Sequence, residues 1–276
     1  MPELPEVETL RRGVEPHVLG RVIERVDVRE PRLRWPVPRS FAAKVKDRRI
    51  TAAGRRAKYL ILALDNGDRV LVHLGMTGRL SVLPPEHPRV KHDHVDFHLR
   101  DAKGRRSLLR FRDPRRFGAI LLWPAKDEGH MLLDELGPEP FDPAFDGHYL
   151  FERSRGRSAP LKSFIMDGRI VVGAGNIYAT EALFRARLRP ARPAGRVTRA
   201  QYALLAAKVR EVLEEAIGQG GTTLRDFANA DGEAGYFAVK LDVYGRDGQP
   251  CRVCGAGIRR AVIGQRSSFY CPSCQR

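Results

Sequence analysis

The sequence predicts an α+β fold: an N-terminal antiparallel β-sandwich with a leading helix, then a helical C-terminal domain that carries a zinc-ribbon β-hairpin. Three observations predict it. Short runs rich in branched residues follow one another from residue 21 to residue 123, helical periodicities dominate residues 158–217, and all four cysteines lie beyond residue 250. A chain of 276 residues is long enough for two domains, each with its own hydrophobic core.

The first 19 residues predict a helix that buries one face. The acidic residues Glu3 and Glu6 lie in its first turn, where negative charge is favourable beside the helix dipole. We therefore expect an ordered N-terminus. The apolar residues that recur at helical spacing are Leu4, Val7, Leu10, Val14 and Val18.

Six short segments of the N-terminal half have the composition of β-strands. Asn66 and Gly67 separate two of them, and this dipeptide is the strongest short-range signal for a β-hairpin. Closely spaced strands joined by turn residues favour an antiparallel sandwich or barrel packed against the first helix. The segments are 21–28, 57–64, 69–74, 94–99, 106–111 and 117–123.

A segment rich in Pro, Gly and Asp, 137–147, interrupts the strand pattern. We therefore predict an N-terminal domain over 1–136, a linker over 137–149, a helical domain over 150–240 and a zinc-binding hairpin over 241–276.

The second half predicts helices at 158–167 and 176–187, on either side of a glycine-containing loop. Thr198 and Gln201 have the spacing of a capping box, which starts a third, longer helix that ends near Ile217. Residues 218–237 are glycine-rich and without periodicity, which is typical of a functional loop.

The net charge of +16 and the isoelectric point near 10.3 favour a polyanionic partner, nucleic acid above all. Arginine supplies most of the 49 basic residues, and its guanidinium binds phosphate through two hydrogen bonds and stacks on bases. No apolar run approaches the roughly 20 residues that span a bilayer. The chain begins with carboxylates, unlike a secretory signal, so we expect a cytoplasmic protein with no membrane partner.

The cysteines form two C-x2-C pairs, Cys251 with Cys254 and Cys271 with Cys274, at the spacing of a zinc ribbon. Two disulfides are the alternative, but a reducing compartment and the strain of a bridge within C-x2-C both oppose it. We predict one structural zinc ion per chain, because four thiolates leave the metal no open position for water. No catalytic metal or organic cofactor is expected.

Pro2 is a candidate nucleophile. The initiator methionine is usually removed before a small residue, which leaves Pro2 with a free secondary amine. An α-amino group has a pKa of about 7.8, so it is neutral far more often than a lysine. A neutral amine can attack the C1′ atom of a sugar, expel the base and leave an iminium that acidifies the C2′ proton. The neighbouring Glu3 or Glu6 can shuttle protons. The alternatives are an inert terminus and carboxylates that only balance the helix dipole.

Seven motifs along the chain resemble those of the bacterial formamidopyrimidine-DNA glycosylases. They occur in the family's order over essentially the whole chain, and one lies at the extreme N-terminus. The resemblance implies a helix-two-turn-helix element in the helical domain, excision of 8-oxoguanine and formamidopyrimidines, and strand cleavage by β,δ-elimination. It also implies a monomer that binds double-stranded DNA containing oxidised purines or abasic sites. The motifs are MPELPEVET, RRAKYL, HLGMTG, DPRRFGA, VVGAGNIYATEALF, GGTTLRDF and QRSSFYCPSCQ.

Carried over by position, the resemblance implies four catalytic residues. Pro2 is the Schiff-base nucleophile, and Glu3 donates and accepts protons beside it. Lys58 contacts a DNA phosphate and assists β-elimination, whereas Arg266, at the tip of the zinc hairpin, is linked to phosphate binding and δ-elimination. Taken alone, Lys58 is also compatible with a solvated lysine at a strand start, and Arg266 with any exposed phosphate contact.

The resemblance further implies a wedge that enters the duplex when the target base is flipped out: Met76, Arg115 and Phe117. The two apolar groups fill the base stack, and the guanidinium hydrogen-bonds the orphaned base. Core packing is the alternative for the two apolar residues. The adjacent arginines and the Asp-Pro turn of the segment 113–118 oppose that alternative.

The remaining expected contacts are to phosphates and to the lesion. Asn176 follows a glycine-containing loop at a predicted helix start, where amides and the helix dipole favour a phosphate; a plain N-cap is the other interpretation. The loop 218–237 is expected to close over the flipped base. Phosphate binding is expected of His73, His92, Arg116, Lys162 and Asn176, and lesion recognition of Glu6, Thr222 and Thr223.

Two other functions fit many of the same features. The sister enzyme endonuclease VIII shares the terminal proline and the zinc ribbon but prefers oxidised pyrimidines, whereas Leu4 and the DPRRFG motif resemble the purine enzyme. A DNA-binding zinc protein without catalysis would retain only the scaffold. The presence of Pro2, Glu3 and Lys58 argues against it.

Overall fold

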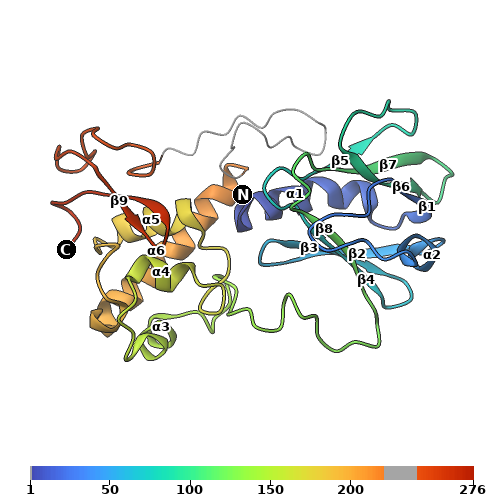
Figure 1. Cartoon of the computed structure of the whole chain (residues 1–276). Helices are drawn as coiled ribbons and strands as arrows, with labels where there is room; N and C mark the ends of the chain where they lie inside the picture. Colours follow the sequence, from blue (N-terminus) through green and yellow to red (C-terminus); the bar gives the residue numbers. More distant parts are fainter. Residues whose placement is uncertain (1, 221–240) are drawn as a thin grey trace. The chain divides into compact units, whose positions relative to one another are not determined.

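The computed structural model describes residues 2–220 and 241–276, which divide into two compact units. The first unit lies within Met1–Asp134, and the second lies within Glu135–Gln219 and Val239–Arg276. A strand-rich first unit and a helical second unit with a terminal hairpin confirm the predicted fold class (Figure 1). Within the described residues, no helix is both long enough and apolar enough to cross a membrane.

Helix α1 (Leu4–Val18) opens the first unit, and its five predicted apolar residues are all buried. Glu3 and Glu6 form a capping box at its start, in which the Glu6 Oε2 atom accepts a hydrogen bond of 2.7 Å from the Glu3 backbone N–H. Pro5 occupies the first turn, where a missing N–H removes no helical hydrogen bond. The first turn of the helix therefore fixes the N-terminal backbone.

Eight strands form two four-stranded antiparallel sheets in the first unit, ordered β1-β6-β7-β5 and β2-β3-β4-β8. Six of the strands match the predicted segments. The prediction missed β2, whose alanines and glycine have low strand propensity, and it also missed β5. The bounds are β1 (Val22–Val28), β2 (Ile50–Arg56), β3 (Tyr59–Leu64), β4 (Arg69–His73), β5 (Arg79–Leu83), β6 (Asp93–Arg100), β7 (Arg106–Arg112) and β8 (Ala119–Trp123).

The predicted hairpin at Asn66 and Gly67 is confirmed. Strands β3 and β4 pair antiparallel on either side of it, and Gly67 has a φ of 84°, which glycine adopts without strain. This hairpin lies at one end of the sheet β2-β3-β4-β8, and His73 and Tyr59 pair at the other end.

The two sheets and α1 share one hydrophobic core, which establishes a sandwich. Val14 of α1, Leu62 of β3 and Phe97 of β6 all belong to this core. Helix α2 (Phe41–Val45), which the sequence did not predict, adds Phe41, whose ring meets that of Phe97 edge-on at 6.0 Å between centroids.

The second unit is helical, as predicted, and the capping box of its longest helix is confirmed. Thr198 Oγ1 accepts from the Gln201 N–H at 3.2 Å, and Gln201 Oε1 accepts from the Thr198 N–H at 3.1 Å. Helix α3 begins at Gly147, inside the segment predicted as a linker, because Asp146 caps its N-terminus. The bounds are α3 (Gly147–Ser154), α4 (Leu161–Met166), α5 (Asn176–Arg185), the 3₁₀ helix η1 (Ala194–Arg196) and α6 (Arg199–Gly218).

The predicted C-terminal hairpin consists of β9 (Arg259–Ile263) and β10 (Arg266–Tyr270), which pair antiparallel. Gly264 and Gln265 join them, both with positive φ, as a tight two-residue hairpin turn requires. Phe269 of β10 shares a small hydrophobic cluster with Phe184 of α5, so the hairpin packs on the helical part of its own unit.

Candidate active site and DNA-binding surface

Pro2, the expected nucleophile, lies directly before helix α1 and is buried. Glu3, the expected proton donor, is the N-cap residue of that helix, and Glu6 is almost fully buried one turn later. The capping box fixes the backbone next to Pro2. A reactive group on a fixed backbone loses little conformational freedom when it meets its substrate.

Lys58 lies in the two-residue turn that joins β2 to β3. Ala57, just before it, has a φ of 52°, in the left-handed region that is unfavourable for residues with a side chain. Tyr59 follows and pairs with His73 on the neighbouring strand. Lys58 and His73 are therefore brought to the same end of one sheet.

His73 is buried, with 3% of its surface exposed. Burial, together with the positive charges of Lys58 and Arg34, lowers its pKa to about 3. Its Nδ1 atom accepts a hydrogen bond of 3.2 Å from the Gly75 N–H, so the neutral ring carries its proton on Nε2. His73 is therefore not an exposed cation that could attract a phosphate by its charge. It is a buried, neutral imidazole, and it also supports the loop 74–78.

The three expected wedge residues are brought together by two loops, 74–78 and 113–118. Met76 and Phe117 are each 43% exposed, which contradicts the core-packing alternative. The Arg115 guanidinium lies over the Phe117 ring, 4.6 Å from its centroid. Two exposed apolar side chains and a guanidinium thus project from adjacent loops.

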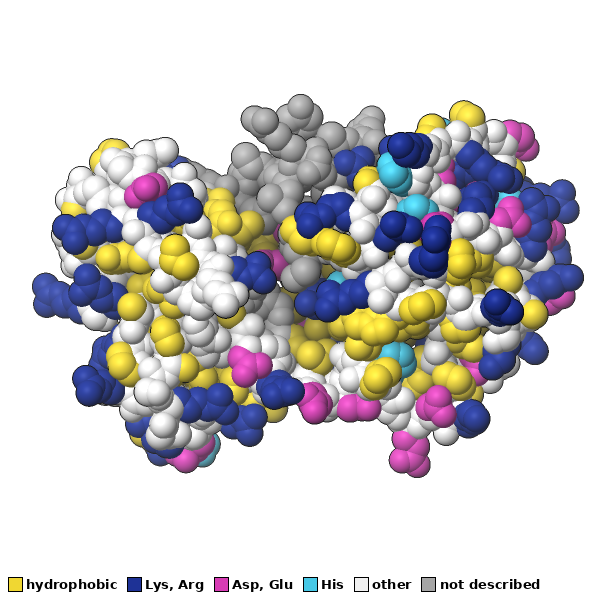
Figure 2. Space-filling model, viewed as in Figure 1, with side chains coloured by type: hydrophobic (Ala, Val, Ile, Leu, Met, Phe, Trp, Pro, Cys, Tyr) yellow, Lys and Arg dark blue, Asp and Glu magenta, His cyan; other side chains and the backbone are white. Residues whose placement is uncertain are grey.

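A basic hollow of about 610 Å³ adjoins the wedge. Three of its lining residues were predicted from the sequence, whereas Arg32 and Arg34 were not. The stretch RLRW at 32–35 is the signal that could have located them, because closely spaced arginines are typical of a nucleic-acid contact. Figure 2 shows Lys and Arg side chains spread widely over the face in view. The hollow is lined by Arg32, Arg34, Arg115, Arg116 and Phe117.

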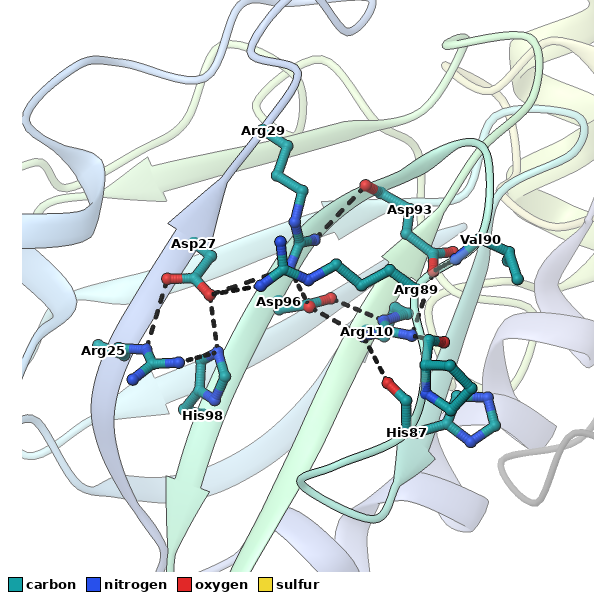
Figure 3. A network of polar contacts seen from close by, with 11 residues as sticks. Arg25, Asp27, Arg29, His87, Arg89, Val90, Asp93, Asp96, His98 and Arg110 are labelled. Carbon is teal, nitrogen blue, oxygen red and sulfur yellow. Dashed lines mark hydrogen bonds and ion pairs between the residues drawn. The ribbon is translucent and has the colours of Figure 1, made fainter.

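His92, another expected phosphate contact, ends the loop 84–92 and has a φ of 76°. A network of ionic contacts on β1, β6 and β7 supports this loop (Figure 3). Its centre is the pair of Asp96 and Arg110, whose Oδ1 and Nε atoms lie 2.9 Å apart, with both side chains buried. Arg29 also pairs with Asp96.

Arg110 and Asp93 connect the network to the loop. The Arg110 Nη1 atom donates to the Pro88 carbonyl oxygen at 2.9 Å and lies 3.1 Å from Asp93 Oδ2, which accepts from the Val90 N–H at 2.9 Å (Figure 3). Because both partners of this ion pair are buried, removal of one would leave an uncompensated charge. The network therefore holds the backbone that leads to His92.

In the second unit, Lys162 of α4 is completely buried. Its Nζ atom donates to Asn176 Oδ1 at 2.6 Å, to Ser268 Oγ at 2.7 Å and to the Ser267 carbonyl oxygen at 3.1 Å. Lys162 is expected to bind a phosphate, but its ammonium is buried at the start of α5, which it joins to β10.

Asn176 is the first residue of α5, and Gly175 is the N-cap. The interpretation of Asn176 as a plain N-cap is therefore wrong. Its side chain instead accepts from Lys162, and Asn176 Nδ2 lies 3.4 Å from the Tyr244 hydroxyl. The first turn of α5 offers the backbone amides that suit a phosphate.

The hairpin carries Arg266 at its exposed tip and the four cysteines beside it. The four cysteine sulfurs all lie within 4.8 Å of one another, which suits tetrahedral coordination of one ion. The Cys251 sulfur accepts from the Val253 N–H, and the Cys271 sulfur from the Cys274 N–H, so both C-x2-C turns aim amides at a thiol. This donor set fits zinc.

Thr222 and Thr223, with most of the loop 218–237, lie outside the described residues. Besides Asp93 and Asp96, two buried carboxyl residues had no role assigned from the sequence: Asp113, at the start of the loop 113–118, and Glu181 of α5. Glu181 accepts from three backbone N–H groups in the segment 242–244 at 2.8 to 3.0 Å. No local pattern marks such partners, because they lie in distant parts of the chain.

Three family profiles match the chain in order. The "Formamidopyrimidine-DNA glycosylase N-terminal domain" matches residues 1–120, the "Formamidopyrimidine-DNA glycosylase H2TH domain" matches residues 136–228, and the "Zinc finger found in FPG and IleRS" matches residues 248–276.

Full-length relatives agree with these matches. The formamidopyrimidine-DNA glycosylase of Stenotrophomonas maltophilia (strain R551-3) is 56% identical over 276 residues, and that of Hahella chejuensis is 53% identical, both over 100% of each chain. The structure of the MutM (FPG) protein of Thermus thermophilus has a TM-score of 0.86 at 41% identity over 99% of this chain and 98% of that one. A complex of Lactococcus lactis Fpg with DNA that contains an abasic site has a TM-score of 0.89 at 31% identity over 100% of both chains. The chain therefore belongs to the formamidopyrimidine-DNA glycosylase family.

Proposed function

We propose that the protein is a bifunctional DNA glycosylase and abasic-site lyase of base-excision repair, which excises 8-oxoguanine and formamidopyrimidines and cuts the strand by β,δ-elimination. The observation that carries this proposal is the N-terminus: Pro2 and Glu3 precede a capped helix in a chain that matches the family over its whole length. Lactococcus lactis relatives have been solved with DNA that contains Fapy-dG or an abasic site, which supports a damaged duplex as the substrate.

The first chemical step uses the secondary amine that Pro2 gains when Met1 is removed. The nitrogen lone pair forms a bond to C1′ of the damaged nucleotide, while the bond from C1′ to the base breaks and the base leaves with that electron pair and takes up a proton. The Pro2 nitrogen, which becomes positively charged in this attack, then loses its proton, and its lone pair expels O4′ from C1′ to leave an iminium between Pro2 and C1′. Glu3 supplies the proton that O4′ accepts.

The second step cuts the strand. The iminium withdraws electrons and makes the C2′ proton acidic, and loss of that proton expels the 3′ phosphate. A further elimination expels the 5′ phosphate. Lys58 contacts a phosphate and assists the first elimination, and Arg266 acts in the second.

DNA binding is assigned to both units. Met76, Arg115 and Phe117 form the wedge, and their joint exposure on adjacent loops supports this role. His92, Arg116 and the start of α5 at Asn176 contact phosphates directly, whereas Lys162 acts through Asn176. His73 contributes an N–H rather than a charge. Glu6, Thr222 and Thr223 recognise the lesion.

A structural zinc ion is proposed for the cysteine cluster of the second unit. Cys251, Cys254, Cys271 and Cys274 would hold it, and it would fix the hairpin that presents Arg266. No catalytic metal or organic cofactor enters the proposed reaction. We further propose a cytoplasmic monomer whose partner is damaged double-stranded DNA.

Borohydride trapping tests the reaction. With duplex DNA containing 8-oxoguanine, the wild-type protein is expected to become covalently attached to the strand, because borohydride reduces the iminium to a stable amine. Pro2→Gly is expected to lose most of this product, and Pro5→Gly, which alters a neighbouring proline of the same turn, is expected to retain it. Full activity of Pro2→Gly without any trapped product would contradict the mechanism.

The choice of substrate separates the proposal from its two rivals. Release of 8-oxoguanine and ring-opened purines faster than oxidised pyrimidines would support the purine enzyme over endonuclease VIII. A protein that binds damaged duplex tightly but is never trapped would be a DNA-binding zinc protein without catalysis.

A further inference from the structure

We propose that Asp113 is a positioning residue whose buried carboxylate ties the Met76 loop, 74–78, to the Arg115 and Phe117 loop, 113–118, and so makes the wedge one rigid body. This inference rests on the proposed function, because it assigns Asp113 a part in opening the duplex before base excision.

The carboxylate of Asp113 contacts both loops at once. Asp113 is fully buried. Its Oδ1 atom accepts from the Thr77 hydroxyl at 2.5 Å and from the Arg115 N–H at 3.3 Å, and its Oδ2 atom accepts from the Gly118 N–H at 2.8 Å. Thr77 Oγ1 in turn accepts from the Arg115 N–H at 3.2 Å. Both carboxylate oxygens are therefore engaged: Oδ1 accepts from donors of both loops, and Oδ2 accepts from a donor of the loop 113–118.

The chemistry of these contacts points to positioning rather than proton transfer. Among the residues that the structure describes, Asp113 makes no ion pair with lysine or arginine, so neutral donors satisfy its negative charge. Such a carboxylate depends on donors held in fixed places, because each has to replace part of its hydration. A fully buried group with both oxygens occupied has no free site for a substrate proton.

The same residue also connects the loops to His92, at the end of the loop 84–92, and to strand β6. The Asp113 N–H donates to the His92 carbonyl oxygen at 3.1 Å, and the Asp113 carbonyl oxygen lies 2.7 Å from His94 Nε2. Three segments of the expected DNA-binding surface thus meet at one residue.

The two wedge loops touch backbone to backbone. A Cβ atom at Gly75 would lie 2.4 Å from the Phe117 carbonyl carbon, and one at Gly118 would lie 2.6 Å from the His73 carbonyl oxygen. Only glycine fits such close approaches. Because no free space separates the loops here, a displacement of one would displace the other.

Rigidity is useful to a wedge of this kind. Met76 and Phe117 remain partly exposed, with no core to hold them. If the loops moved independently, ordering them would oppose insertion into the base stack; a wedge ordered in advance avoids that loss. The effect should be large for a paired, stacked target and absent where the DNA is already open.

A substitution at Thr77 removes the hydrogen bond between the two loops without altering Asp113, the wedge side chains or the catalytic residues. Thr77→Val keeps the shape of the side chain and removes the hydroxyl that joins the loops, whereas Thr77→Ser keeps that hydroxyl. Duplex opening is measured by stopped-flow fluorescence of 2-aminopurine placed beside 8-oxoguanine. We expect Thr77→Val to open the duplex about tenfold more slowly, the effect of one lost hydrogen bond to a charged group, and Thr77→Ser to remain within about twofold of wild type.

A second substrate separates opening from chemistry. Borohydride trapping is measured on an abasic site within an unpaired bubble, where no base pair has to be broken. Both Thr77 variants are expected to trap at the wild-type rate. Asp113→Asn provides an independent variant: its amide faces one of the N–H or O–H donors, so it should slow duplex opening and preserve bubble trapping.

The inference is overturned if Thr77→Val opens duplex as fast as wild type, if Thr77→Ser is as slow as Thr77→Val, or if bubble trapping falls in step with opening. If wild-type protein traps on neither substrate, the proposed function itself is wrong, which is a different outcome. Should Thr77→Val fail to fold, Asp113→Asn and Thr77→Ser give the same comparison.

Discussion

The two units organise their expected DNA contacts around buried polar side chains of opposite kinds. In the first unit, the carboxylate of Asp113 collects donors that lie 2, 5 and 36 residues away along the chain. In the second unit, the amine of Lys162 donates to acceptors 14, 105 and 106 residues away. Asp113 joins neighbouring loops at one end of the sandwich. Lys162 joins two helices to the C-terminal hairpin.

This difference predicts how far the structural effect of a substitution would extend in each unit. The sandwich has its own core of strands and α1, so loss of Asp113 would disturb loops on a platform that remains intact. The hairpin shares only a small cluster with Phe184 of α5, and Lys162 joins its strand β10 to α4 and α5. Lys162 should therefore matter more for stability, and Asp113 more for the rate of duplex opening.

The largest effect is expected for Lys162→Met. An apolar side chain leaves the oxygens of Asn176, Ser267 and Ser268 without this donor, at roughly 1–3 kcal/mol for each unsatisfied group, and the gain from no longer burying an amine offsets part of that loss. We expect the second unit to lose about 3 kcal/mol and the protein to bind duplex DNA at least about tenfold more weakly. Calorimetric unfolding and fluorescence anisotropy measure the two effects.

The salt dependence of binding distinguishes a buried tie from a phosphate contact. If Lys162 touched a phosphate, its loss would reduce the slope of log affinity against log salt by about 1 and leave stability unchanged. If it ties the hairpin, stability falls and the slope does not change. Lys208→Met is the control in the same unit, because Lys208 is a partly exposed helix residue paired with Glu211 and should contribute little.

Much of the fold was predictable because its signals are local. The spacing from Leu4 to Val18 identified α1, and Thr198 with Gln201 identified the start of α6. Strand β2 escaped prediction because only its pairing with β3 makes a strand of a segment rich in alanine, glycine and arginine. Helix α3 escaped because a Pro- and Gly-rich stretch hides the Asp146 cap.

The candidate site was predictable in residue type but not in environment. The resemblance identified Met76, Phe117 and Lys162 by position, and the structure leaves the first two exposed and buries the third. Burial of this kind follows from contacts across more than 100 residues. Asp113 was visible only as part of an Asp-Pro turn, because its role depends on where Thr77 lies in space.

A smaller effect, confined to acidic solution, is expected for His73→Asn. The pKa of His73 is lowered to about 3 in the fold, against about 6.5 in the unfolded chain, so the unfolded chain binds a proton first as the pH falls. Stability from this residue is complete above pH 6.5 and is lost as the pH drops, by roughly 2 kcal/mol at pH 5. Asn keeps an acceptor for the Gly75 N–H and removes the titration.

Unfolding of the first unit measured at pH 7 and pH 5 tests this prediction. The loss of stability between the two values should be smaller in His73→Asn than in wild type. Thr77→Val is the control, since it removes a contact of the same loop without removing a titrating group, and its loss should parallel that of wild type. An equal loss in His73→Asn and wild type would mean that the buried ring does not govern the acid response of this region.

The smallest effect is expected for Glu181→Gln, which tests whether charge or geometry matters in the second unit. Burial raises the pKa of Glu181, although three backbone N–H groups donate to it. Gln keeps the Oε1 acceptor for Val243 and Tyr244 but loses the contact to Asp242, and it no longer has to bury a charge. These opposing effects should change the free energy of unfolding by about 1 kcal/mol or less.

The pH dependence gives a second readout for Glu181. Because its folded pKa lies above the unfolded one, wild-type stability from this residue increases as the pH falls toward about 4.5, and the Gln variant should lack that increase. Unfolding of the second unit between pH 7 and pH 4.5 measures both effects. A loss of stability above about 3 kcal/mol at pH 7 would show that the charge of Glu181 holds the segment before the hairpin as firmly as Lys162 holds the hairpin. The stability of the second unit would then depend on two buried charges rather than one.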